Sequence, residues 1–156
     1  MSEATHSDLG IRATGMNFGI VAARFNETYV DALVDRCRVY IEEAGGTVTV
    51  DRVPGSGELP FAASAFARGE FDALIALGLV LKGETDHHNH LAHATGAALQ
   101  QVAIDSGIPV INGIIVVNNE EEADARTLGS INRGLEFGRA AVEMAHFRKT
   151  WMKNHQ

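Results

Sequence analysis

Residues 71–81 of the chain read FDALIALGLVL, and this stretch decides the fold. From Ala73 to Leu81 it carries no polar side chain and shows no alternation of polar and apolar residues. Such a run is typical of a strand that is covered on both faces, as strands are in parallel sheets packed between helices. We therefore expect a parallel sheet with this strand inside it.

Three other stretches have the length and composition of strands. Residues 18–23 (FGIVAA), residues 47–53 (TVTVDRV) and residues 110–117 (VINGIIVV) are short and rich in apolar or β-branched side chains. Glycine, proline or asparagine residues lie near their ends, where turns are expected. Together with residues 71–81, these stretches give an expected sheet of four strands.

Apolar residues at helical spacing occupy the segments between the expected strands. One helix begins after Asn26, a candidate helix cap, and ends before Gly45. Others are expected over residues 59–67, over residues 87–106, and from Glu120 to about Phe147. The helix between Asn26 and Gly45 has its apolar positions at Val30, Leu33, Val34, Cys37 and Ile41.

Strand and helix alternate along the chain, which predicts an α/β fold. Right-handed βαβ connections place the helices on both faces of a four-stranded parallel sheet, giving a flavodoxin-like three-layer α/β/α sandwich. We expect a single domain over residues 16–156, preceded by a flexible polar arm over residues 1–15. Ligands of such sheets bind beyond the carboxyl ends of the strands.

Composition and charge restrict the classes of partner. The chain has 156 residues, of which 46% are hydrophobic and 21% charged, as in a globular domain. Its net charge of −7 argues against a nucleic-acid partner, and no apolar run approaches the ~20 residues of a membrane span. The single cysteine, Cys37, excludes an internal disulfide and a cysteine-based zinc site. These features favour a cytoplasmic protein.

Four histidines lie between residues 87 and 93, directly after the third expected strand. Proton transfer is one explanation, because histidine titrates near neutral pH. Metal binding by His90 and His93 is a second, which the lack of an HExxH pattern and of an acidic third ligand disfavours. A solvated helix start is the third, and it suits His90 and His93. We predict a functional His87 and no metal.

The other segments that follow strands also carry candidate functional residues. Phe25 can stack on a planar ring or pack in the core. Glu58 begins a helix, where an acid also complements the helix dipole. Gly83 and Thr85 precede a helix and can hold a phosphate, or form a simple turn. Arg126 can bind an anion or form a surface ion pair. The segments that we group after strands are residues 24–26, residues 54–58, residues 82–88, and Asn112 with residues 118–119.

Taken together, these segments resemble the lumazine synthase (6,7-dimethyl-8-ribityllumazine synthase) family. The resemblance runs in order from about Asn17 to Ala145, nearly the whole chain. It is carried by ARFN at residues 23–26, VPGSGELP at residues 53–60, GLVLKGETDH at residues 78–87, PVING at residues 109–113, and residues 120–126.

The resemblance implies an activity. It is the condensation of 5-amino-6-(D-ribitylamino)uracil with 3,4-dihydroxy-2-butanone 4-phosphate to 6,7-dimethyl-8-ribityllumazine, the penultimate step of riboflavin biosynthesis. A transferase of this kind needs orientation and proton transfer but no electron sink, so no cofactor is expected. Alternatives are a catalytically weak shell-forming or flavin- or lumazine-binding paralogue, and a histidine-rich metal-binding protein.

The resemblance also implies roles for single residues. His87 would transfer protons, and Arg126 would bind the phosphate from an adjacent subunit. The remaining positions would be Phe25, Gly57, Glu58, Leu79, Val80, Leu81 and Asn112 for the pyrimidine substrate, and Gly83, Glu84, Thr85 and Arg133 for the phosphate. The family usually has aromatic residues at the positions of Gly57 and Asn112.

Assembly is a further implication of the resemblance. The small-molecule substrates would bind between subunits of a homopentamer, and twelve pentamers would form an icosahedral 60-subunit capsid in the larger assembly. Riboflavin synthase is a candidate partner.

Overall fold

A four-stranded parallel sheet forms the centre of the protein. In the computed structural model, which describes residues 8–152, the strand order is β2-β1-β3-β4. Its strands are β1 (Asn17–Ala23), β2 (Thr47–Val53), β3 (Ala73–Leu81) and β4 (Val110–Val117). β1 and β3 lie inside the sheet and are almost fully buried, as their unbroken apolar sequences predicted.

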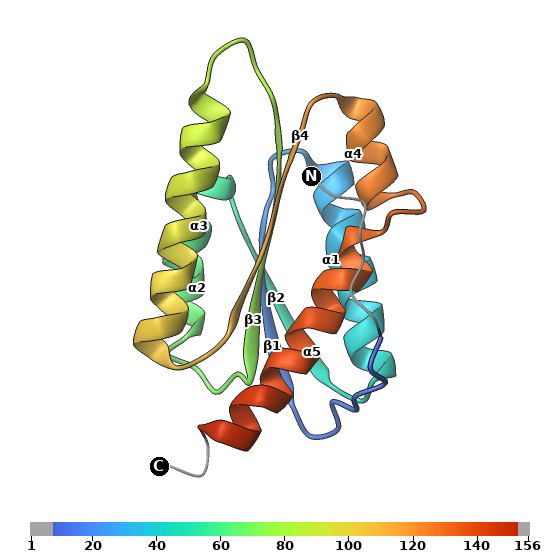
Figure 1. Ribbon diagram of the computed structural model, residues 1–156, viewed down its shortest axis with the longest axis vertical. Coiled ribbons are helices and arrows are strands. Elements are labelled where there is room, and N and C mark those ends of the chain that lie inside the picture. The colour runs from blue at the N-terminus through green and yellow to red at the C-terminus, as the bar shows by residue number, and fades with distance from the viewer. Residues whose placement is uncertain (1–7, 153–156) are drawn as a thin grey trace.

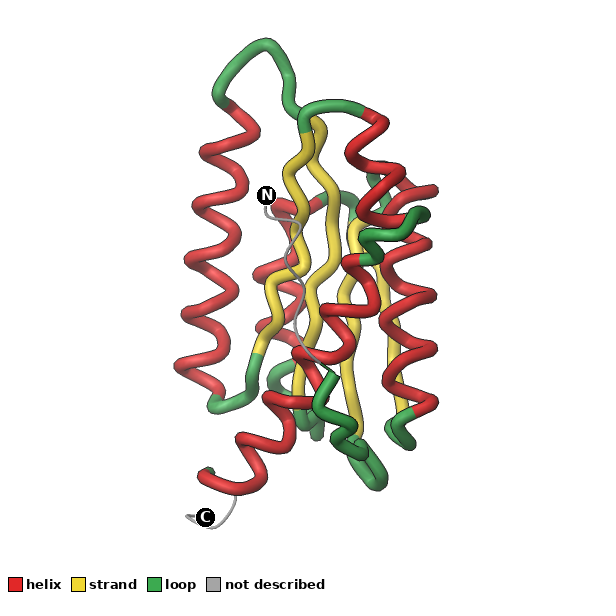
Figure 2. Tube along the Cα trace, turned by 45° about the vertical axis from the view of Figure 1, so that its right-hand side comes forward, coloured by secondary structure: helices red, strands yellow, loops and turns green. Residues whose placement is uncertain are grey.

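Helices cover both faces of this sheet. Figure 1 shows α2 (Leu59–Phe66) and α3 (His87–Ser106) on one face, and α1 (Glu27–Glu43), α4 (Glu120–Thr127) and α5 (Arg133–Trp151) on the other. A short 3₁₀ turn, η1 (Ser56–Glu58), precedes α2. Figure 2 shows the same layers from another side. The predicted three-layer α/β/α sandwich is therefore confirmed.

Two of the expected elements differ from the structure by more than one residue at an end. The third strand begins at Ala73 and not at residue 71. Phe71 lies before it, and its ring stacks on that of Phe66 with the ring centroids 5.2 Å apart. The last helical region is divided into α4 and α5, and α5 continues to Trp151. The division is held by Arg36 of α1, whose guanidinium donates hydrogen bonds to the carbonyl oxygens of Leu128 and Gly129.

Helices α1 and α5 pack at very close range. A Cβ atom on Gly134 would lie 2.8 Å from the carbonyl oxygen of Leu33, and one on Gly138 would lie 3.1 Å from that of Cys37. Because neither glycine has a side chain, the two helix backbones can approach each other. Cys37 is completely buried here, which raises the pKa of its thiol to about 12 and confirms it as a core residue.

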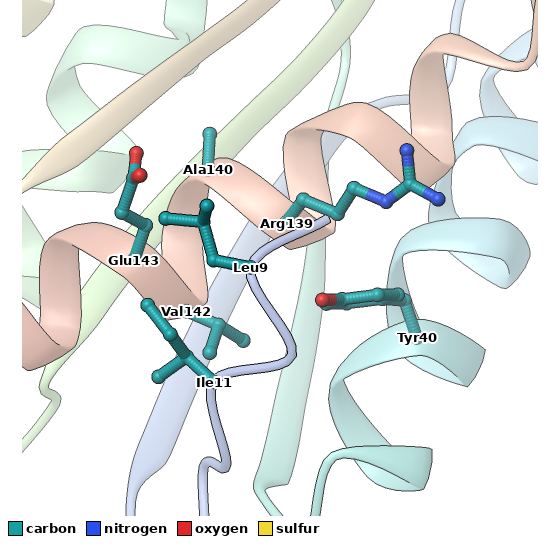
Figure 3. A pocket seen from close by; sticks show the side chains of 7 residues that line it. All are labelled: Leu9, Ile11, Tyr40, Arg139, Ala140, Val142 and Glu143. Atoms are coloured by element: carbon teal, nitrogen blue, oxygen red, sulfur yellow. The ribbon is translucent and has the colours of Figure 1, made fainter. Parts of the chain in front are cut away.

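The segment before β1 lies on the domain. Residues 1–7 of the expected arm lie outside the described residues, whereas Ala13 is buried and donates its backbone N–H to the carbonyl of Ala44. Figure 3 shows Leu9 and Ile11 against α5, near Tyr40 of α1. The hydroxyl of Tyr40 donates a 2.9 Å hydrogen bond to Asp8. Residues 8–15 thus contact α1 and α5 of their own chain.

Asp8→Asn is expected to lower the midpoint of thermal unfolding at neutral pH by about 1 °C, since an exposed ion pair contributes little. The Gly10 amide, the Tyr40 hydroxyl and Arg139 hold the pKa of Asp8 below its ordinary value. Because its pKa is lowered, ionised Asp8 stabilises the folded state at any pH above the pKa of the unfolded chain. This stabilisation is lost as the pH falls through the pKa of the folded state. Calorimetry should find that the difference from the wild type disappears in acid. The control is Glu143→Gln on α5, close to Leu9 and Ile11, and an equal trend there would contradict the assignment.

Candidate active site

An open cavity lies at the carboxyl ends of β1, β2 and β3, at the end of the sheet that is uppermost in Figure 1. Its volume is about 580 Å³, within the range of small-molecule sites. The cavity lies where the fold was expected to bind a ligand. It is lined by Phe25, Asn26, Gly55, Ser56, Gly57, Glu58, Leu79, Val80, Leu81 and Leu91.

Phe25 stands at the rim of this cavity. The segments that leave β1 and β2 remain hydrogen-bonded, because Arg24 donates to the carbonyl of Val53 and Phe25 donates to that of Pro54. The side chain of Phe25 is 73% exposed, so the alternative that it packs in the core is wrong. An exposed aromatic ring beside a cavity can stack on a planar ligand.

Asn26 occupies the N-cap position of α1, as predicted, but its side chain forms no cap hydrogen bond. Its backbone is left-handed, with φ 63°, and its Nδ2 donates a 2.7 Å hydrogen bond to the carbonyl oxygen of Leu79. Asparagine is one of the few residues that adopt this conformation readily. Asn26 therefore joins the end of β1 to the end of β3.

The turn that carries Glu58 lies directly on β3. A Cβ atom on Gly78 would be 2.4 Å from Oγ of Ser56, so the turn can approach the strand only because residue 78 has no side chain. Ser56 is buried, and the N–H of Glu58 donates to the carbonyl of Gly55 within the turn. A Cβ on Gly57 would lie 3.5 Å from Cδ1 of Leu91, an ordinary contact.

The predicted phosphate loop follows β3 directly. Gly83, Glu84 and Thr85 are exposed, and Oγ1 of Thr85 accepts a 3.4 Å hydrogen bond from the backbone N–H of His87. His87 is the first residue of α3 and is exposed, whereas Nδ1 of His88 is buried with no hydrogen-bond partner among the described residues. None of these residues lines the cavity, although the loop leaves from its edge at Leu81.

Asn112 is not in a segment after a strand. It is the third residue of β4 and pairs with Ala76, whereas the part of β3 that lines the cavity begins at Leu79. A Cβ on Gly96 of α3 would lie 3.2 Å from Nδ2 of Asn112, so the amide faces α3. Asn112 is exposed and contributes nothing to the cavity of its own chain.

The two arginines predicted to bind phosphate are buried. Arg126 is 8% exposed, which excludes the alternative of a surface ion pair. One of its Nη atoms donates a 3.4 Å hydrogen bond to the carbonyl of Glu122, and its Nε has no hydrogen-bond partner in the described part of the chain. Arg133 forms a buried ion pair with Glu136 on α5. Neither arginine lines the cavity.

Within residues 8–152, no three side chains of His, Cys, Asp or Glu are grouped so that they could hold a metal ion. No helix in this range is long and apolar enough to cross a membrane.

The site combines an exposed aromatic ring, a carboxylate, backbone groups at the end of β3 and a glycine loop at the start of α3. The ring and backbone edge suit a planar heterocycle, and the carboxylate suits hydroxyl donors. Sequence reasoning did not assign Asn26, Ser56 or Leu91 to the site. Asn26 and Ser56 lie in the segments that follow β1 and β2, but the contacts of their side chains with β3 could not be predicted from those segments.

Comparison with known proteins agrees with these features. The family model of 6,7-dimethyl-8-ribityllumazine synthase matches residues 15–149. The chain is 40% identical over 140 residues to the protein of that name from Chromobacterium violaceum, covering 87% of this chain and 88% of the relative. It is 39% identical over 147 residues to the one from Xanthomonas campestris pv. campestris, covering 91% and 96%. For the one from Cupriavidus pinatubonensis, the identity is 43% over 136 residues, covering 85% and 80%.

Proposed function

The chain belongs to the 6,7-dimethyl-8-ribityllumazine synthase family. We propose that it carries out the reaction of that family in the cavity at the carboxyl ends of β1, β2 and β3. The protein is a transferase of riboflavin biosynthesis that condenses 5-amino-6-(D-ribitylamino)uracil with 3,4-dihydroxy-2-butanone 4-phosphate. The observation that supports the assignment is that Phe25, Glu58 and Leu79–Leu81, which come from separate segments, line one cavity.

The pyrimidine binds in this cavity. Phe25 stacks on the ring, the backbone groups of Leu79, Val80 and Leu81 bind its polar edge, and Glu58 accepts hydrogen bonds from the ribityl hydroxyls. The small residue Gly57 leaves space between this turn and Leu91. Phe25 and Glu58 are held in register because the Phe25 N–H bonds to Pro54, at the start of the Glu58 turn.

The reaction needs proton transfer at several steps. The pyrimidine amine adds to the ketone, and water leaves as the imine forms. Phosphate leaves with the loss of a proton from carbon, and the second amine then closes the ring with loss of water. His87 transfers protons in these steps, since it opens α3 directly beyond the cavity edge and histidine exchanges protons near neutral pH.

The phosphate of the second substrate binds to the loop of Gly83, Glu84 and Thr85 at the start of α3. In a chain of net charge −7, a local cation is needed, and we assign this role to Arg126. Arg133 is a second candidate, from the resemblance to the family. Arg126 lines no part of the cavity of its own chain, so we assign it to the site of a neighbouring subunit.

Arg126→Ala is expected to raise KM for the butanone phosphate by about 10-fold or more and to leave the affinity for the pyrimidine within about 3-fold. Loss of a charge-assisted hydrogen bond to phosphate carries a cost of this size. Steady-state kinetics with each substrate varied in turn measures the two effects. Arg36→Ala, which removes a cation that holds the α4–α5 connection, is the structural control. An equal loss of pyrimidine affinity in Arg126→Ala would refute the assignment.

Assembly into homopentamers, with sites shared between subunits, follows from the same reasoning. Asn112 and Arg126 lie outside the cavity of their own chain, and the groove between α2 and α3 exposes Phe61, which is 82% accessible. Cyclic symmetry lets such unlike surfaces pair and close into a ring. Twelve pentamers as an icosahedral 60-subunit capsid, riboflavin synthase as a partner, and a cytoplasmic location remain predictions from sequence.

Light scattering on the untagged protein is expected to give at least five times the chain mass of 16.7 kDa, and sixty times that mass if the capsid forms. The reason is that a solitary chain lacks the residues that we assign to its neighbour. A fully active monomer at micromolar concentration would rule out both the ring and the shared site.

The overall proposal is tested by mixing the purified protein with the two substrates. Lumazine absorbance and fluorescence should appear without added metal or cofactor. Binding of the pyrimidine without turnover would favour a catalytically weak paralogue instead.

A further inference from the structure

One edge of β3 is left without a neighbouring strand at the cavity. Pairing of β1 with β3 ends at Ala22 and Leu77, whereas β3 continues to Leu81 beside β4. The backbone groups of Leu79 and Leu81 that would face a longer β1 therefore meet no strand. Backbone groups of this kind need a partner, from a side chain, water or a ligand.

The side chain of Asn26 supplies one such partner. Its Nδ2 donates to the carbonyl oxygen of Leu79 at 2.7 Å, in a partly buried position. The amide can reach Leu79 because the backbone of Asn26 turns into the left-handed region, with φ 63° and ψ 46°. The hydrogen bond thus replaces one rung of the ladder beyond the end of β1.

The neighbouring contacts connect this hydrogen bond to the rest of the site. Phe25, the preceding residue, is bound through its N–H to Pro54, and its ring stands free at the rim. Phe25 and Leu79 line the same cavity. The bond from Asn26 is therefore a direct link between the segment that carries the aromatic ring and the backbone edge of β3.

We propose that Asn26 is a positioning residue for the heterocycle, which fixes the ring of Phe25 relative to the backbone edge of Leu79–Leu81. The inference rests on the proposed function of this cavity. A flat ring must meet a stacking partner on its face and hydrogen-bonding groups on its edge at the same time, so the spacing between the two has to be set before binding. Asn26 sets it through the hydrogen bond that its side-chain amide donates to Leu79.

Two substitutions separate the hydrogen bond from the backbone conformation. Asn26→Gly keeps the left-handed backbone without strain but removes the donor. Asn26→Asp keeps both shape and conformation, but an ionised carboxylate would face the Leu79 carbonyl as a second acceptor. Once protonated, the introduced carboxyl regains an O–H donor, so acid should restore the bond.

The experiment measures equilibrium binding of 5-amino-6-(D-ribitylamino)uracil under reducing conditions, from pH 8 to pH 5, without the second substrate. Each variant is compared with the wild type at the same pH, because Glu58 lines the cavity and Glu27 follows Asn26. At pH 8 both variants are expected to bind about 10-fold more weakly, the effect of an unmade hydrogen bond. By pH 5 Asn26→Asp should recover to within about 3-fold, whereas Asn26→Gly should not.

A second measurement needs no ligand. The carboxyl that donates to Leu79 has a raised pKa in the folded state, so it stabilises the fold at low pH and loses this effect as the pH rises. The unfolding midpoint of Asn26→Asp should therefore approach that of the wild type in acid, unlike that of Asn26→Gly. Asn132→Asp is the matched control, because Asn132 is also left-handed but caps α5 by accepting from Leu135. The unfolding midpoint of that variant should not approach the wild-type value in acid.

The outcomes decide the proposal separately from the function. If Asn26→Asp and Asn26→Gly lose pyrimidine affinity in parallel at every pH, or lose none, Asn26 is not a positioning residue. If acid restores the stability of Asn26→Asp but not its affinity for the pyrimidine, the hydrogen bond to Leu79 has only a structural role. This result would also overturn the proposal. If the wild type binds neither substrate, the proposed function itself is refuted. The unfolding curves of the variants test only the hydrogen bond from Asn26 and do not bear on that function.

Discussion

An enzyme with alanine in place of His87 is expected to form lumazine about 10²-fold more slowly than the wild type. General acid–base catalysis by a positioned side chain has about this effect, and the remaining rate comes from orientation of the two substrates. His87 opens α3 and its side chain is exposed, so the substitution removes no core packing. KM for both substrates should change little, since the loss falls on the chemical step.

The matched control is His93→Ala, which changes another exposed histidine about two turns further along α3. It should keep the full rate, and imidazole in the buffer should raise the rate of His87→Ala alone. Single-turnover kinetics gives the rate of the chemical step directly. Full activity in a correctly folded His87→Ala enzyme would remove His87 from the mechanism.

Gly134→Leu is expected to destabilise the fold by about 2–3 kcal/mol, as overpacking of a well-packed core does. Its Cβ would lie 2.8 Å from the carbonyl oxygen and 3.1 Å from Cα of Leu33, both backbone atoms that no rotamer change can move. Helix α5 would have to lift from α1. Urea unfolding measures the loss of unfolding free energy. In thermal unfolding, the same loss should lower the midpoint by about 5–10 °C.

Two further glycine substitutions test this explanation. Gly134→Ala should destabilise less than leucine, because it adds only the Cβ atom. Gly83→Ala should leave stability unchanged, since a Cβ there meets nothing within 4 Å. If leucine at residue 134 were tolerated without loss, the close approach of α1 and α5 would not depend on this position.

Most of the fold could be predicted from the sequence because its signals are local. The apolar runs of β1 and β3 and the helical spacing from Val30 to Ile41 depend only on neighbouring residues, and all became the expected elements. The break between α4 and α5 could not be predicted. It depends on Arg36, which lies more than ninety residues earlier in the chain and holds the carbonyls of Leu128 and Gly129.

The candidate site divides in the same way. Phe25 and Glu58 were predicted because each stands just after the end of a strand, and a parallel sheet brings such positions together. Leu79–Leu81 were predicted only from the resemblance to the family. Asn26 looked like a simple helix cap, since no sequence pattern reveals that its side chain turns to Leu79. Asn112 was wrongly grouped with the segments that follow strands, although the strand expected over residues 110–117 already contained it.

The exposure of Phe25 has a consequence for the heat of ligand binding. The ring is 73% accessible and stands beside an open cavity lined by leucine and valine side chains. A ligand that covers them releases ordered water from apolar surface, so the heat capacity of the system must fall on binding. Calorimetric titrations at increasing temperature would then give a steadily more exothermic reaction, while the affinity itself changes far less.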